Sequence, residues 1–306
     1  MPSIDTNRTS LSLPTEIANE IMQKAQDSSA VMQLARGIAL PGTGLTIPVI
    51  TGDPEAAWVA ETNVKPTSNP SLTTKNMTPY KLAVIVPFSD EFRRDMARLY
   101  DALVQRLPGA LAKKFDATVF GGVAPGSGFD VLTGCSAESI SSGSPARGIY
   151  KALVAADTGI AAAGYDVSGF ALSPQARGVI LEAVDSTGRP IFINTPAEDV
   201  GGKLLGHDAF YSRGLYVAGN AASGTSGQSG YVAAKDDVLG FAGDWTQAMY
   251  GTVEGIKIDI SDQATLTIGT EAVNLWERNM FAVRAEIEVG FVADTSAFRK
   301  ITRTHA

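Results

Sequence analysis

The fold is decided by one stretch, residues 46–107, with the sequence TIPVITGDPEAAWVAETNVKPTSNPSLTTKNMTPYKLAVIVPFSDEFRRDMARLYDALVQRL. Its first part predicts an extended arm, and residues 63–71 predict a polar tip without an apolar cluster. The apolar residues on the way out are Val49, Ile50, Trp58 and Val59. An isolated two-stranded ribbon is only marginally stable in water, so arms of this length need a surface to lie on. If the rest of the fold does not supply that surface, a neighbouring chain must, and the stretch therefore indicates a subunit of an assembly.

The second part of the stretch predicts a strand that returns along the arm and then a long helix. Apolar residues recur with the period of a strand at Leu82, Val84, Val86 and Phe88. Ser89 is a good N-cap, and apolar residues then recur at helical spacing. They are Phe92, Met96, Leu99, Leu103, Leu107, Leu111, Phe115 and Val119. Pro108 is expected to kink or break this helix, because proline removes a hydrogen bond and clashes one turn back.

The remaining sequence mixes helices and strands. Helices are expected at about residues 14–27, after Pro145 and after Ser173, and short strands at 170–172 and 191–193. Residues 256–260 and 281–291 alternate apolar and polar side chains, which predicts two half-buried strands. The later strand is long and needs partner strands, which the arm and long-helix region can supply. This order predicts an α+β fold in which one discontinuous domain holds a second domain, about residues 130–255.

Composition excludes several classes of protein. The 306 residues carry a net charge of -7, and the densest basic group, Arg93, Arg94 and Arg98, is interleaved with acidic residues. The chain therefore lacks the basic block with which proteins grip nucleic acid. Cys135 is the only cysteine, so no intrachain disulfide can form, which fits a reducing compartment. No signal peptide is visible, and no window of some 18 apolar residues predicts a membrane span.

The motifs of conventional catalysis are absent from the sequence. There is no G-x-S-x-G motif and no phosphate-binding G-x-x-x-x-G-K-[ST] motif, because Lys203 is followed by leucine. The only histidines are His207 and His305, and no Cys/His/Asp cluster has the spacing of a metal site. We therefore expect no turnover enzyme, no cofactor and no bound metal.

Several segments, taken in order, resemble one known family. They are residues 60–66 (AETNVKP), 79–92 (PYKLAVIVPFSDEF), 170–174 (FALSP), 188–192 (GRPIF) and 274–286 (NLWERNMFAVRAE). Together they resemble the major capsid protein of tailed bacteriophages, of the HK97 type, over nearly the full chain. No single motif is decisive, but the ordered set is fairly specific.

The resemblance implies a division of the chain into four parts of the HK97-like capsid fold. It implies an N-arm (residues 1–45), an extended E-loop hairpin (46–88), a P-domain with a long spine helix and long strands (89–129 and 256–306), and an α/β A-domain (130–255). Such subunits form hexamers and pentamers of an icosahedral shell around packaged double-stranded DNA, and the shell matures from a procapsid. Acidic net charge suits a wall that touches DNA only by weak, non-specific contact.

The resemblance also implies partners and a location. A portal and a decoration protein are candidate partners, and because the N-arm begins almost at Met1, scaffolding would come from a separate protein. The expected location is the virion capsid, after assembly in the host bacterial cytoplasm. The alternative within the same fold is an encapsulin-like compartment shell that encloses protein cargo.

One branch of the family joins its subunits by isopeptide bonds, and three residues match its pattern. Lys65 matches the lysine that attacks, Asn279 matches the asparagine side chain on a neighbouring subunit, and Glu286 matches the glutamate that assists. A lysine is nucleophilic only when neutral, so it needs desolvation and a nearby base. The alternative is that these residues serve packing or salt bridges without a covalent bond. The resemblance further implies intersubunit contacts at Trp58, Lys65, Leu82, Val84, Arg93, Arg94 and Arg284.

Overall fold

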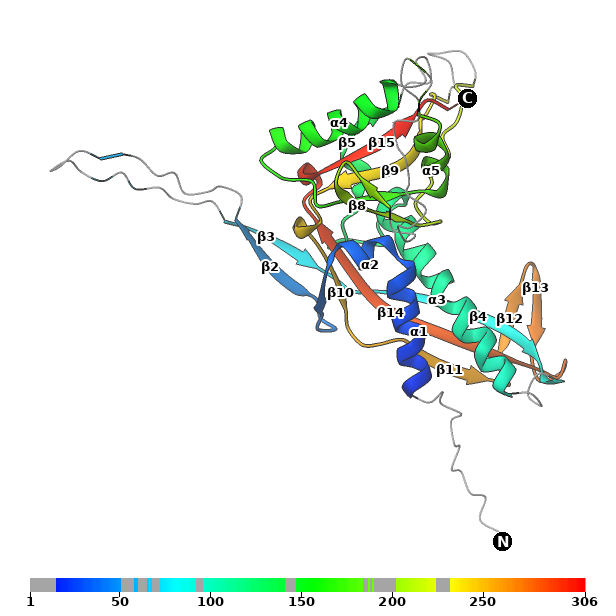
Figure 1. Cartoon of the computed structure of the whole chain (residues 1–306). Helices are drawn as coiled ribbons and strands as arrows, with labels where there is room; N and C mark the ends of the chain where they lie inside the picture. Colours follow the sequence, from blue (N-terminus) through cyan, green and yellow to red (C-terminus); the bar gives the residue numbers. More distant parts are fainter. Residues whose placement is uncertain are drawn as a thin grey trace, which may run out of the picture.

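The computed structural model describes residues 15–50, 58, 59, 65, 67, 72–91, 96–140, 147–183, 187, 189, 202–223 and 232–305. Two β-sheets share one continuous body, and the β-hairpin of β2 (Leu45–Ile50) and β3 (Leu72–Met77) projects from it (Figure 1). The expected strand at 191–193 and the arginines Arg93 and Arg94 lie outside the described residues.

The first sheet is built around β14, Met280–Ala293, the longest strand. One edge of β14 pairs with β10 (Ala248–Thr252) near its end and with β11 (Lys257–Ser261) nearer its start, and β1 (Arg36–Ala39) extends the sheet beyond β10. The opposite edge of β14 pairs with β4 (Tyr80–Ser89). β1 and β10 are parallel, whereas β10, β11 and β4 all run antiparallel to β14. The alternation predicted for 281–291 is confirmed from Val283 to Val289, where Ala285 is buried and Arg284 is exposed, whereas Ala282 and Gly290 are buried as well.

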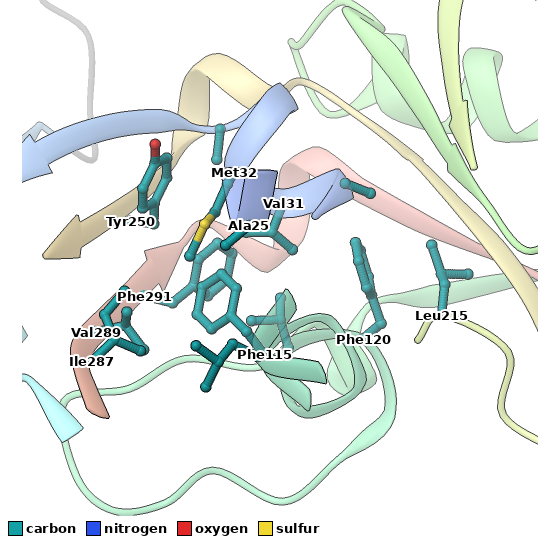
Figure 2. Close-up of a cluster of buried hydrophobic side chains, with 14 of the residues drawn as sticks. Ala25, Val31, Met32, Phe115, Phe120, Leu215, Tyr250, Ile287, Val289 and Phe291 are labelled. Carbon is teal, nitrogen blue, oxygen red and sulfur yellow. The ribbon is translucent and has the colours of Figure 1, made fainter. Parts of the chain in front are cut away.

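Three helices pack on the apolar side of this sheet. They are α1 (Thr15–Ser28), α2 (Ala30–Leu34) and the long α3 (Met96–Gly121). Figure 2 shows the resulting core, in which Val31 and Met32 from α2 and Phe115 from α3 lie beside Phe291 of β14. Phe115 meets Phe291 edge to face, with ring centroids 6.5 Å apart. Aromatic pairs of this kind add to the stabilisation from buried apolar area.

The second sheet has six strands in the order β5 (Ser136–Ser139), β15 (Phe298–Arg303), β9 (Asp237–Gly243), β6 (Gly169–Leu172), β8 (His207–Tyr211) and β7 (Lys203–Leu204). Helices α4 (Arg147–Ala162) and α5 (Pro174–Leu181) cover one face, where Leu153 and Phe170 are fully buried. Alternate strand residues such as Phe241 and Phe298 point to the other face and join the core of the first sheet. The core of the first sheet therefore extends onto one face of the second sheet, while α4 and α5 cover a separate core on the opposite face.

Buried Asp116 on α3 joins three segments of this body. Its carboxylate accepts hydrogen bonds from Ser29 Oγ (2.6 Å), the Ala30 amide (3.0 Å) and Ser212 Oγ (2.5 Å). Ser29 is at the same time the N-cap of α2, and it accepts from the Met32 amide. Burial raises the pKa of Asp116, although these hydrogen bonds act in the opposite direction.

Two hairpins stand apart from the main sheets. β2 (Leu45–Ile50) and β3 (Leu72–Met77) form the base of the projecting hairpin, here called the β2–β3 arm, residues 45–77. β12 (Thr265–Ile268) pairs with β13 (Glu271–Asn274) near the far end of β14. The short 3₁₀ helices are η2 (Leu132–Gly134), η3 (Trp245–Gln247) and η4 (Thr295–Ala297).

Several predicted elements are confirmed. The helix expected at 14–27 is α1, the helix after Ser173 is α5 with Ser173 as its N-cap, and the strand at 256–260 is β11. The long strand does find its partner in the arm and helix region, since β4 pairs with it over ten residues. A long helix also follows Ser89, although its described part begins only at Met96.

Two expectations need correction. Residues 82–88 do not return along the arm: β4 turns into the first sheet, where Leu82 and Val84 pack on the core because β14 offers a matching apolar face. Pro108 does not break the helix either, since α3 continues from Met96 to Gly121. Buried Leu107 and Leu111 on either side of the proline hold both halves to one core.

Sheet membership also differs from the expected domain boundaries at two strands. β10, within the expected A-domain segment 130–255, belongs to the first sheet. β15, within the expected P-domain segment 256–306, belongs to the second sheet, between β5 and β9. The apolar residues Phe298 and Ile301 are buried there, so the chain crosses between the sheets once more than the sequence suggested.

Candidate assembly surfaces

The β2–β3 arm carries the first group of candidate contact residues. Trp58 is completely exposed, and Lys65 and Thr67 are also exposed. Among the described residues, β2 and β3 pair only with each other. A fully solvent-exposed tryptophan is uncommon, because its side chain is large and apolar. Tryptophan side chains frequently anchor protein interfaces. The arm therefore presents side chains that its own chain does not cover.

The turn before β14 holds Asn279, which the sequence identified as a crosslink candidate. Its φ angle is +50°, in the left-handed region, where asparagine is among the few tolerated residues. Its carbonyl oxygen accepts a hydrogen bond from the Asp90 amide (2.9 Å), and its side chain is exposed. The backbone of this turn therefore explains an asparagine here without any covalent role.

Glu286 lies on the charged face of β14. It pairs with Arg284 (Nε to Oε1, 3.2 Å), and Arg284 also bonds Asp259 on β11 (2.7 Å). The hydrogen bond to Asp259 and the charge of Glu286 raise the pKa of Arg284. Glu286 follows Met280 by six strand residues, or roughly 20 Å. One chain therefore does not bring Asn279 and Glu286 together, and each has its own partners.

The other candidate contact residues divide between the core and the surface. Leu82 and Val84 are half-buried and pack on the core of their own chain, whereas Arg284 is exposed in its ion pairs. Trp276, within the segment 274–286 that carries the family resemblance, is 73% exposed in the turn before Asn279. An exposed aromatic residue in a polar turn is the signal that could have marked it as a contact residue.

The base of the β2–β3 arm holds contacts with the body that the sequence did not reveal. Lys75 Nζ lies 3.2 Å from Asp130 Oδ2 and 2.7 Å from the Ala293 carbonyl oxygen. Met77 is fully buried beside Gly251 and Gly290, which face each other in the register of β10 and β14. An isolated glycine inside an apolar strand signals close approach of another segment, and Gly290 in the sequence EVGFVA carried that signal.

The described residues show neither a metal centre nor a membrane-spanning helix. Within them, no group of three or more His, Cys, Asp or Glu side chains is arranged to hold a metal ion. None of the helices in the described part is long and apolar enough to cross a membrane. Cys135 is buried, and burial raises the pKa of its thiol to about 11.

Comparison with known proteins agrees with this architecture. The model of the phage capsid family matches residues 10–302. The probable major capsid protein gp17 of Mycobacterium phage L5 is 31% identical, over 96% of this chain and 90% of that protein. A solved structure from Gordonia phage Cozz (24% identity, TM-score 0.66) covers 91% of this chain and 87% of that one. One from Mycobacterium phage Cain (20% identity, TM-score 0.68) covers 100% and 95%.

The two sheets, the long helix α3 and the projecting hairpin are therefore those of the HK97-like capsid fold, the class of proteins that build viral shells. The chain belongs to the phage capsid family. Members of this class are structural proteins rather than enzymes, in agreement with the absence of catalytic motifs from the sequence.

Proposed function

We propose that this chain is the major capsid protein of a bacteriophage, and that copies of it build the closed shell of the virion. The observation that carries the proposal is the family match over residues 10–302, together with an arm that exposes Trp58 away from its own core. A shell subunit needs such an arm, because the surface that covers the arm belongs to the next copy. The family match favours this function over the compartment shell.

The parts of the fold suggest how the shell is organised. The β2–β3 arm acts as the E-loop, the first sheet with α3 as the P-domain, and the second sheet as the A-domain at the centre of hexamers and pentamers. β10 then belongs to the P-domain and β15 to the A-domain. The net charge of -7 suits a wall that encloses DNA without gripping phosphates. A portal and a decoration protein are the proposed partners of the shell, and assembly takes place in the host cytoplasm.

At the arm tip, the non-covalent role of Lys65 is the better supported of the two alternatives. Asn279 is accounted for by its left-handed backbone, and Glu286 by its ion pair with Arg284. Lys65 then forms a salt bridge with a carboxylate of the next copy.

One experiment tests both the capsid function and the non-covalent role of Lys65. Purified particles, assembled with the proteins encoded beside this gene, are imaged by electron microscopy and then boiled and run on denaturing gels. Closed shells and a single band at the monomer mass are the expected results. Absence of shells contradicts the capsid function, and a ladder of bands that collapses in Lys65→Ala contradicts the non-covalent role alone.

A further inference from the structure

The direction of the β2–β3 arm is fixed at its base. Among the described residues, β2 and β3 form a sheet of their own, so strand pairing does not hold the arm against the body. A hairpin of six residues a strand is roughly 20 Å long, and a tilt of about 15° moves its far end by about 5 Å. Small changes at residues 75–80 therefore move the contact surface of the arm by more than the width of an atom.

Met77 provides the first attachment point. It is fully buried against Leu40 and Val292. A Cβ added to Gly251 would lie 2.9 Å from Met77 Sδ, and one added to Gly290 would lie 2.8 Å from Met77 Cγ. The paired glycines thus form the recess that receives Met77. A single flexible side chain in a recess fixes the position of the arm but leaves its angle free.

Lys75 provides the second point. It precedes Met77 by two residues and so points to the same face of β3. Its ammonium group donates to Asp130 Oδ2 and to the Ala293 carbonyl oxygen. Asp130 is itself tied to β14, because its carboxylate accepts from the Ala293 amide (3.2 Å) and its own amide donates to the Phe291 carbonyl oxygen (2.9 Å). Lys75 is therefore bound to the end of β14 through two oxygen atoms.

The residues after β3 secure the same corner. The Thr78 amide donates to the Gly128 carbonyl oxygen (2.9 Å), and Tyr80 Oη donates to the Ser127 carbonyl oxygen (2.7 Å). Gly128 has a φ of +77°, and a Cβ there would lie 2.5 Å from Thr78 Oγ1. The glycine-containing loop that follows α3, residues 122–128, is thus shaped to receive the base of the arm.

We propose that Lys75 and Asp130 form a clamp that sets the angle at which the arm leaves the body, and that this angle decides whether copies of the chain close into a shell. The inference rests on the proposed function. Stabilising the monomer is a poor explanation for the pair, since both side chains are about one-third exposed, at 36% and 35%. Exposed ion pairs contribute only about 0–1 kcal/mol to stability. The clamp instead fixes the angle between the arm and the body.

The test uses the full chain with Lys75→Met, which keeps the length of the side chain and removes its charge. Lys75→Arg is the conservative variant, and Lys24→Met is the matched control, because Lys24 forms an exposed pair with Glu20 far from the arm. Spin labels at Thr67→Cys and Lys257→Cys report the distance between arm and body, with buried Cys135 as the only other thiol. Assembly is measured by sedimentation and electron microscopy.

For Lys75→Met we expect a melting temperature within about 2 °C of wild type, a broadened label distance and an assembled fraction reduced at least about tenfold. Lys75→Arg and Lys24→Met are expected to match wild type in both measurements. A Lys75→Met protein with an unchanged distance and normal shells overturns the clamp and leaves the capsid function intact. Failure of the wild-type protein to form shells overturns the proposed function instead.

Discussion

At the scale of single residues, Asp116 is the buried side chain that connects three segments of the fold by hydrogen bonds. Asp116→Ala leaves the hydroxyls of Ser29 and Ser212 and the Ala30 amide without their buried acceptor. Each unsatisfied buried group costs about 1–3 kcal/mol, so we expect the free energy of unfolding to fall by about 3–5 kcal/mol. Chemical denaturation of the unassembled chain measures this. Asp157→Ala on the exposed side of α4 is the control and is expected to change stability by less than about 0.5 kcal/mol.

Asp237 makes stability depend on pH. Burial alone would raise its pKa, but hydrogen bonds from the Gly219 amide, His305 and Arg303 outweigh it and lower the pKa to about 2, from an ordinary 3.8. Because the folded pKa is the lower one, this carboxylate stabilises the fold above about pH 4, and the effect is lost as pH falls towards 2. The contribution is about 2 kcal/mol.

Asp237→Asn removes this contribution and identifies its source. At pH 5 the variant is expected to have a lower free energy of unfolding than wild type, and this difference should shrink towards pH 2. Denaturant titrations at the two pH values measure it. A difference that stays constant over this range would show that the Asp237 carboxylate does not titrate as described.

At the scale of elements, α3 contains a helix position that is poorly filled. Gly109 lies inside the helix, is exposed, and has open space where a Cβ would be. Gly109→Ala is expected to stabilise the chain by about 0.5–1 kcal/mol, because alanine loses less backbone entropy on folding. The melting temperature of a chain of this size should rise by about 1–2 °C. Gly128→Ala, at a φ of +77°, should lower it.

The elements that could be predicted were those with a clear period. β4 places large apolar residues at every second position from Leu82 to Phe88, and β14 alternates apolar and charged residues from Val283 to Val289, so both strands and the apolar face of β14 followed from the sequence. The sequence indicated only the region that pairs with β14. It did not identify β4 as the partner or give the register, because the two segments are about 200 residues apart and the period does not specify a partner. β9 was missed because all seven of its residues are buried, which removes alternation. At the candidate site, Lys65, Asn279 and half-buried Glu286 could be found from the sequence, whereas the recess for Met77 exists only in three dimensions.

At the scale of the whole molecule, the body and the β2–β3 arm are expected to be separable. The described core residues lie outside 51–71, and Ile50 faces Leu72 in the register of β2 and β3. A chain in which Asn-Gly replaces residues 51–71 can therefore close the hairpin with a two-residue turn that matches the twist of the strands. Met77 and Lys75 stay in place, so the attachment of the arm is retained.

This shortened chain should fold normally and fail to assemble. We expect its melting temperature to stay within about 2 °C of wild type, because the segment removed contributes no described core residue. Its sedimentation should be that of small species under conditions in which the wild-type chain forms shells, because Trp58 and Lys65 are lost with the segment. A large drop in melting temperature would show that the arm tip stabilises its own body. Shells of normal size would show that contacts between the bodies alone are sufficient for closure, and that the arm is dispensable.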